Sequence, residues 1–274
     1  MTLVVGVLLA LLALSSTVGA GLELELSRVR TSELWKPLAA ALAANLLVIP
    51  LGGLLLLKAA DLPASSFVGL ALVALAPGGA SAPLLARLAG GEPTRIGAVY
   101  VALCAGCLIS VGVAMPLVLP AQGGGLRVLL ITLMLQLAPL LAGLGLRARR
   151  GELAIRTAAC LRRVGSLLLV SVVVMLLITR GSFLFTMGVA TLVSMLLLVV
   201  LSLAAGALTS SPRLPDALLA CVRNLTLALM IAETQQPGGA ATLVVAAYGL
   251  VMYVVASLCL WAHNRADRGV QESP

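Results

Sequence analysis

Long runs of apolar residues, separated by short polar or charged stretches, follow one another along the whole chain. A helix that crosses a bilayer needs about 20 mostly apolar residues, whereas strands of a membrane barrel show polar and apolar residues in alternation. The runs here are continuous and do not alternate. The pattern predicts an all-α polytopic membrane protein of about nine transmembrane helices. We expect these helices at residues 2–22, 35–57, 66–86, 95–118, 126–146, 158–178, 183–208, 214–232 and 239–262.

Two of the predicted helices contain residues that break or strain a helix in lipid. The first break lies in 66–86, where two prolines and two glycines fall within eight residues. Proline removes a backbone hydrogen bond and glycine weakens a helix, so a regular helix cannot continue through this stretch. The freed backbone groups need partners from protein or from water in a cavity. The residues concerned are Pro77, Gly78, Gly79 and Pro83.

The second break lies in 214–232, where Arg223, Asn224 and Thr226 bring a charge, an amide and a hydroxyl into an apolar segment. Both breaks fall in the second-to-last span of their half of the chain, taken as 1–120 and 126–274. Interrupted spans at matching positions indicate inverted repeats, with a binding site at the midplane. We therefore expect two repeats, of four and five spans, whose broken helices cross.

Composition and charge support this assignment. Hydrophobic residues make up 61% of the chain and charged residues 10%, against about 25% charge in soluble domains. Of the 18 basic residues, 14 fall on one side of the predicted spans and three, Lys58, Arg127 and Arg180, on the other. Basic loops remain cytoplasmic. We expect a multi-pass protein of the plasma (inner) membrane, surrounded by the lipid bilayer, with its N-terminus outside and its C-terminus cytoplasmic. The net charge of +8 is then a consequence of topology and indicates no nucleic-acid partner.

Arg223 is the most informative single residue, because a charge inside a span is costly and no acid lies in the middle of a span to pair with it; the nearest in sequence, Asp216, stands at the start of the predicted span, seven residues away. Two interpretations remain open. Its guanidinium faces an anionic substrate or a water-filled cavity, or its role is structural and it snorkels toward the membrane surface or binds carbonyl oxygens that the other break exposes.

Four further polar residues are candidate site residues, each with a structural alternative. Asn45 either forms an interhelical hydrogen bond or contributes to a site, and Asn224 and Thr226 either cap loose backbone or bind substrate. Ser81 has the same two possibilities. The pair Cys104 and Cys107 has the spacing of a metal or redox pair but lies inside a span, where a pair of small packed side chains is the better interpretation.

Motifs of metalloproteases, P-loop proteins and serine hydrolases do not occur in the sequence. We therefore expect no enzyme, no cofactor and no catalytic residues.

At the two breaks the sequence resembles the bile acid:sodium symporter family. Residues 76–83 read Ala-Pro-Gly-Gly-Ala-Ser-Ala-Pro, similar to the family's Cys-Pro-Gly-Gly-Thr-Ala-Ser-Asn, and 88–92 read Leu-Ala-Gly-Gly-Glu, similar to Leu-Ala-Lys-Gly-Asp. Residues 21–24 before a basic loop, Asn45 ahead of Pro50, and the Arg-Asn pair at 223–224 are also similar. The resemblance implies a core and a panel domain that move against each other, in a nine-helix form that lacks the family's first helix.

Several family sodium ligands are absent from this chain. Ala82 and Pro83 stand where the family has Ser-Asn, Leu219 stands where it has Glu, and Arg223 replaces a Gln. Hydroxyls are also mostly missing from residues 99–104.

Asn45 and Asn224 remain as matches around which sodium could bind. The leading hypothesis is a secondary transporter of a small organic anion, bile-acid-like or another carboxylate, with lost or altered sodium coupling. Arg223 would attract the anion or stand in for a sodium charge. The alternatives are a sodium-coupled symporter with non-standard ligands and a non-transporting membrane sensor or assembly protein.

Overall fold

The computed structural model describes residues 2–23, 35–114, 130, 133–209, 213–235 and 239–271. These residues are helical apart from short connections, and none of them lies in a β-strand. The result agrees with an all-helical membrane protein, because a helix satisfies most of its backbone groups inside its own segment.

The first half of the chain contains both continuous and interrupted helices. A π-helical segment, η2, joins α3 to α4, and residues 76–81 separate α5 from α6. The predicted break in 66–86 is therefore present. The elements are α1 (Thr2–Glu23), α3 (Trp35–Ala43), η2 (Ala44–Val48), α4 (Ile49–Ala59), α5 (Ala64–Leu75), α6 (Ala82–Leu88), α7 (Pro93–Ile109) and η3 (Ser110–Ala114).

The second half shows the second predicted break, at residues 222–224 between α13 and α14. Residues 126–129 and 131–132 of the predicted span 126–146 lie outside the described residues. The elements are η4 (Leu133–Leu137), α10 (Ala138–Arg149), α11 (Gly151–Thr186), α12 (Val189–Ala207), α13 (Arg213–Cys221), α14 (Leu225–Gln235) and α15 (Ala240–Gln271).

One predicted boundary is wrong. The sequence predicted a connection between spans 158–178 and 183–208, but α11 runs without interruption through those residues to Thr186. The chain bends at Met187 and Gly188, whose ψ angles of 143° and 142° are extended. A glycine at 181 weakens a helix by only about 1 kcal/mol, so a short polar stretch with one glycine does not suffice to end it.

Five segments of the described chain are long and apolar enough to cross a membrane. Two shorter apolar helices, Ala10–Glu23 and Ala64–Leu75, accompany them. The protein is thus a multi-pass integral membrane protein by length and composition, while the count of nine spans stays a prediction. The five segments are Trp35–Ala59, Pro93–Ala114, Val189–Ala207, Arg213–Glu233 and Ala240–Ala266.

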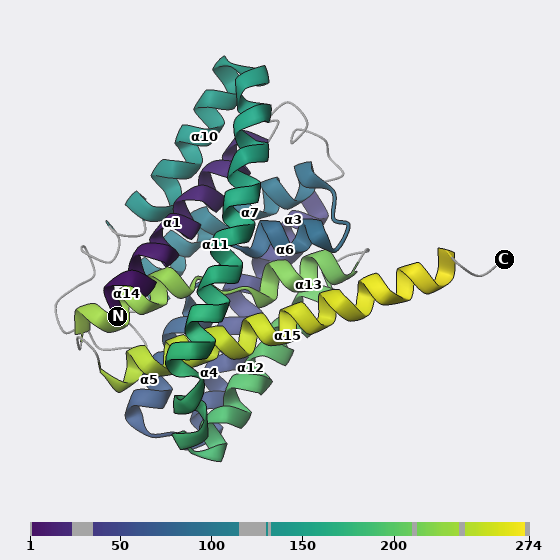
Figure 1. Cartoon of the computed structure of the whole chain (residues 1–274). Coiled ribbons are helices and arrows are strands. Elements are labelled where there is room, and N and C mark those ends of the chain that lie inside the picture. The colour runs from purple at the N-terminus through teal and green to yellow at the C-terminus, as the bar shows by residue number, and fades with distance from the viewer. Residues whose placement is uncertain are drawn as a thin grey trace.

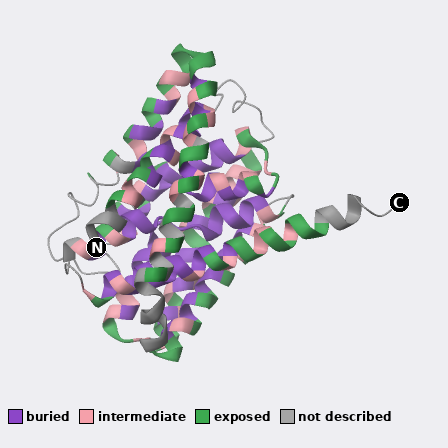
Figure 2. Cartoon of the chain, in the orientation of Figure 1, coloured by how far each residue is buried: buried purple, intermediate pink, exposed green. Residues whose placement is uncertain are grey.

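Three helices, α1, α10 and α11, pack closely on one another, and we call them the three-helix group (Figure 1). A Cβ added to Gly21 would lie 2.4 Å from the carbonyl oxygen of Leu140, and one added to Gly143 would lie 2.4 Å from that of Val18. Small residues therefore let α1 and α10 approach to backbone contact, as is common between membrane helices. The remaining helices share one large buried apolar cluster (Figure 2).

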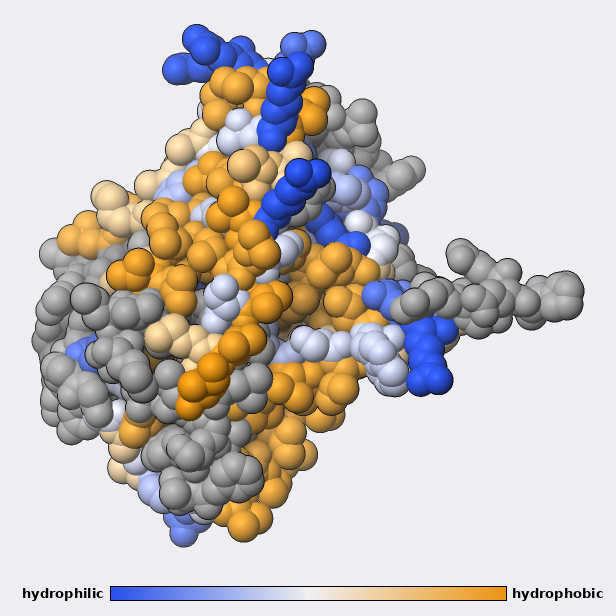
Figure 3. Space-filling view, in the orientation of Figure 1, coloured by the Kyte–Doolittle hydropathy of each residue, from blue (hydrophilic) through white to orange (hydrophobic). Residues whose placement is uncertain are grey.

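Apolar residues form most of the visible face, with hydrophilic residues gathered at a few places on it (Figure 3). Ion pairs join Glu23 to Arg87 and Arg95 to Asp216. All four residues lie at or near helix ends. The first pair thus connects α1 to α6, and the second connects α7 to α13.

Candidate functional site

The two interrupted helices meet at their breaks. The backbone N–H of Gly79 donates to the carbonyl of Val222 at 3.0 Å, and the N–H of Asn224 donates to the carbonyl of Ala76 at 2.9 Å. Each break therefore satisfies backbone groups that the other leaves open. We call this contact between residues 76–79 and 222–224 the crossing.

Glycine is required in the first break for two separate reasons. Gly78 has a φ of +74°, a conformation that side chains with a Cβ rarely adopt. Gly79 has no such φ, but a Cβ there would lie 2.4 Å from the carbonyl oxygen of Arg223 and 2.6 Å from that of Val222. Because Gly79 has no Cβ, the backbone of the first break can lie directly against the backbone of the second.

The Arg223 side chain is 1% exposed and points into the end of α5. Its Nε donates to the carbonyl of Val73 at 3.2 Å, and its Nη2 donates to that of Ala74 at 2.6 Å. Its Nη1 donates to Oδ1 of Asn45 at 2.9 Å. The guanidinium thus binds carbonyl oxygens that the first break exposes, which is one of the arrangements that the sequence left open.

A cation is electrostatically favourable at this position. The last carbonyls of a helix lack intrahelical partners and carry the negative end of its dipole. Arg223 supplies both a positive charge and several donors to the C-terminus of α5. Because α5 stops at Leu75, inside an apolar segment, this end would otherwise leave buried acceptors without partners.

Three π-helical segments each place one buried polar side chain at the crossing or directly beside it. Asn45 of η2 accepts from Arg223, while its Nδ2 donates to the carbonyl of Ala41 at 3.0 Å. Ser110 of η3 donates to the carbonyl of Leu75 at 2.5 Å, and Gln136 of η4 donates to that of Gly78 at 3.0 Å. A π-turn adds a residue to a helical turn and is frequent at functional sites.

The other predicted residues also lie at the crossing or next to it. The Ser81 hydroxyl is 2.9 Å from the Tyr253 hydroxyl of α15. Asn224 caps α14, because its Oδ1 accepts from the N–H of Leu227 at 3.1 Å, while its buried Nδ2 has no hydrogen-bond partner among the described residues. Thr226 is buried in the first turn of α14. Pro83 occupies the first turn of α6, where its missing N–H costs nothing.

Ser110 and Gln136 are site residues that the sequence analysis missed. Each stands alone in an apolar run, which is the same signal that drew attention to Asn45. Tyr253 was missed as well, because a tyrosine in an apolar helix is common and its partner, Ser81, is far away in sequence.

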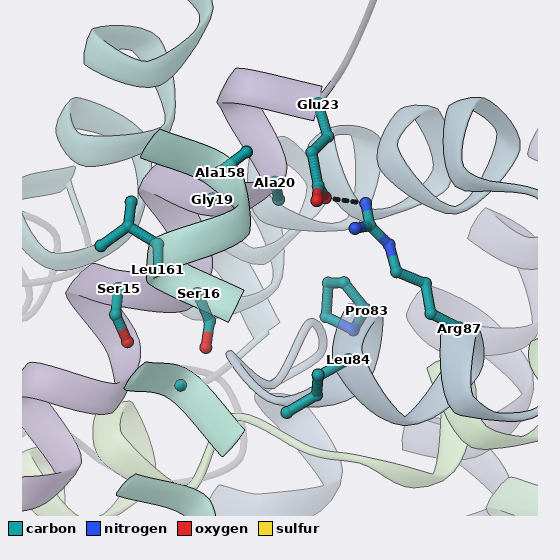
Figure 4. Close-up of a pocket in the computed structure, with 11 residues that line it drawn as sticks. Ser15, Ser16, Gly19, Ala20, Glu23, Pro83, Leu84, Arg87, Ala158 and Leu161 are labelled. Atoms are coloured by element: carbon teal, nitrogen blue, oxygen red, sulfur yellow. Dashed lines mark ion pairs between the residues drawn. The ribbon is translucent and has the colours of Figure 1, made fainter. Parts of the chain in front are cut away.

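A small cavity lies between α1, α6 and α11 (Figure 4). Its volume is ≈ 30 Å³, which suffices for a water molecule but not for an organic solute. It lies between α1 and α11 of the three-helix group and α6, the second part of the first broken helix. Its lining residues are Ser15, Ser16, Gly19, Ala20, Glu23, Pro83, Leu84, Arg87, Ala158, Leu161 and Gly165.

The oxygens around Arg223 form a set that could hold a cation. Backbone carbonyls and an amide oxygen are ligands of hard cations, and ends of half-helices coordinate sodium in several transporter folds. Here a guanidinium occupies that set. Among the described residues, no group of three or more His, Cys, Asp or Glu side chains could hold a metal ion.

No protein-family model matches this chain, and no curated protein is significantly similar to it. The resemblance to the bile acid:sodium symporter family therefore stays a prediction that rests on the residues quoted above.

Proposed function

We propose that the protein is a secondary transporter that moves a small organic anion across the membrane by alternating access, without coupling to sodium. The observation that carries the proposal is the crossing of two interrupted helices with a fixed cation at its centre. Interrupted helices at matching places of two halves are a pointer to the substrate region of transporters. Their cost in lipid argues for a role beyond membrane anchoring.

In this proposal Arg223 takes the place of a coupling ion. A bound sodium ion enters and leaves in each cycle, whereas an arginine keeps its charge at neutral pH and stays covalently attached. Its acceptors are two carbonyls of α5 and Asn45, so it holds the broken helices together in the way that a bound ion would. Leu219 stands where the family has the acid that balances sodium, so the acid and the sodium ligands are absent together. The charge of Arg223 is balanced instead by the carbonyl dipoles at the end of α5.

The transported solute would enter along the seam between the three-helix group and α6. The cavity marks this seam, and the small side chains on α1 leave it open to widening. Alternating access then consists of movement of the three-helix group against the helices of the crossing.

Uptake is expected to be independent of sodium. Purified protein in proteoliposomes should take up radiolabelled cholate or pyruvate equally well in sodium chloride and in choline chloride, because the coupling charge is built into the chain. Protein-free liposomes serve as the control. Uptake that disappears in choline would contradict the proposal and favour the sodium-coupled alternative, and no uptake in either salt would favour a non-transporting protein.

The proposed orientation has an independent test. In a variant whose Cys160 and Cys259 are replaced by serine, we expect Lys58→Cys to react with a membrane-impermeant maleimide in intact cells. Arg150→Cys should react only after the cells are opened, because the basic side is cytoplasmic. Labelling of Arg150→Cys in intact cells would reverse the topology.

A further inference from the structure

Glu23 and Arg87 form an ion pair at one end of the small cavity (Figure 4). The Arg87 side chain is 12% exposed and that of Glu23 is 16% exposed. Both charges are thus largely removed from water. A charge in such a place needs a partner of opposite sign, because an uncompensated buried charge is strongly destabilising.

The pair joins two parts of the molecule that would have to separate in transport. Glu23 is the last residue of α1, in the three-helix group, and Arg87 lies in the last turn of α6. Because α6 begins directly after the crossing, Arg87 belongs to the second part of the first broken helix. An organic solute needs a site of about 300 Å³ or more, so the seam has to open beyond its present ≈ 30 Å³ before a solute can enter.

We propose that Arg87 binds the carboxylate of the transported anion, and that Glu23 occupies this position while the site is empty. The inference rests on the proposed function. An incoming carboxylate replaces the carboxylate of Glu23 on the same guanidinium, so Arg87 is never left without an acceptor. Glu23 is released at the same time, and the contact between α1 and α6 is lost. A neutral solute offers no charge for this exchange and is rejected.

The two buried arginines then have different roles. The acceptors of Arg223 include two backbone carbonyls of α5, which a solute cannot replace without unravelling the helix end. Arg87 is paired with a carboxylate side chain on another helix, which can move away. Exchange of one carboxylate for another is therefore possible at Arg87 and not at Arg223.

The first test is uptake of radiolabelled cholate and pyruvate by proteoliposomes. Glu23→Gln removes the competing carboxylate and should lower the KM for the transported probe about tenfold, a difference of about 1.4 kcal/mol. Arg87→Gln should raise it at least tenfold, and Arg87→Lys should fall between because an ammonium lacks the planar fork. Asp216→Asn, in the ion pair away from the cavity, is the matched control and should leave KM unchanged.

The second test measures binding without transport. A thiol introduced by Ser16→Cys, in a variant lacking Cys160 and Cys259, lines the cavity and reports whether the seam is closed. Glu23→Gln should speed its alkylation, and the exchanged pair Glu23→Arg with Arg87→Glu should return it to the parent rate. Cholate or pyruvate should alter this rate in the parent but not in Arg87→Gln.

The outcomes separate the two proposals. If the probes act on the thiol through Arg87 but are not transported, the carboxylate site stands and the proposed transport is wrong. If the probes act equally in Arg87→Gln, or KM is the same in that variant and the parent, the assignment of Arg87 is overturned while transport stands. If neither probe changes the rate in the parent, the assignment is likewise overturned.

Discussion

Replacing Arg223 by methionine is expected to lower the free energy of unfolding by about 2–4 kcal/mol and to abolish uptake. The carbonyl oxygen of Ala74 and Oδ1 of Asn45 lose their donor, and a buried acceptor without a partner costs about 1–3 kcal/mol. Relief of the desolvation of the guanidinium offsets part of this loss. The measurement is the thermal unfolding midpoint in detergent, together with uptake by proteoliposomes.

The matched control is Arg149→Gln. Arg149 is exposed at the end of α10, so its replacement should change stability by no more than about 0.5 kcal/mol. Arg223→Lys should give an intermediate loss, because an ammonium keeps the charge but cannot reach three separated oxygens with the geometry of a guanidinium. A methionine variant as stable and as active as the parent would contradict a role for Arg223 in holding the crossing.

Chemical rescue distinguishes a stand-in for a cation from an ordinary packed side chain. Arg223→Ala leaves an empty space lined by the oxygens of Val73, Ala74 and Asn45. Guanidinium chloride at low millimolar concentration should restore part of the lost thermal stability, because the free ion offers the same donors and charge. Choline chloride, which has no N–H donor, should not. If neither guanidinium nor sodium restores stability, the comparison of Arg223 with a bound ion is wrong.

The sequence predicted both breaks because their signal is local. Pro77, Gly78 and Gly79 lie in an apolar run, and their effect on a helix does not depend on the rest of the fold. The charge, amide and hydroxyl of the second break are visible in the same way. The meeting of the two breaks was also an expectation, derived from their matching positions in two halves, and the backbone hydrogen bonds between residues 76–79 and 222–224 agree with it.

The partners of Arg223 could not be predicted in the same way. Its acceptors on α5 are backbone carbonyls of Val73 and Ala74, and neither side chain carries a signal. The sequence could therefore state that a buried arginine needs acceptors, but it could not distinguish the end of a broken helix from a substrate. Only the place where α5 ends decides between them.

The π-helical segments could not be predicted from the sequence, for a different reason. A π-turn changes the register of a helix by one residue and leaves the apolar pattern nearly unchanged. This change turns Ser110 and Gln136 toward the first break. The long helix α11 shows the opposite case, since a polar stretch that indicated a loop remains helical and the chain bends at Gly188 instead.

Gly79→Ala is expected to be the most damaging single-methyl change at the crossing, with a loss of stability at or above the upper end of the range of about 1–3 kcal/mol for overpacked cores. The new Cβ would meet the carbonyl oxygens of Arg223 and Val222 at 2.4 and 2.6 Å, and backbone atoms cannot move away by changing rotamer. Relief of the clash has to separate the two breaks, which removes the hydrogen bonds of Gly79 and Asn224.

Gly79→Ala should lower uptake as well as stability, because separation of the two breaks also moves Arg223 away from the end of α5. Gly145→Ala is the matched control: Gly145 lies in α10, and an added Cβ there meets nothing within 4 Å. That substitution should stabilise the helix by about 0.5–1 kcal/mol, since alanine restricts the unfolded chain more than glycine does. Thermal unfolding in detergent and uptake by proteoliposomes measure both variants. If Gly79→Ala unfolds at the same temperature as the parent and still transports, the two breaks are not in backbone contact, and the crossing cannot be the rigid centre around which the three-helix group moves.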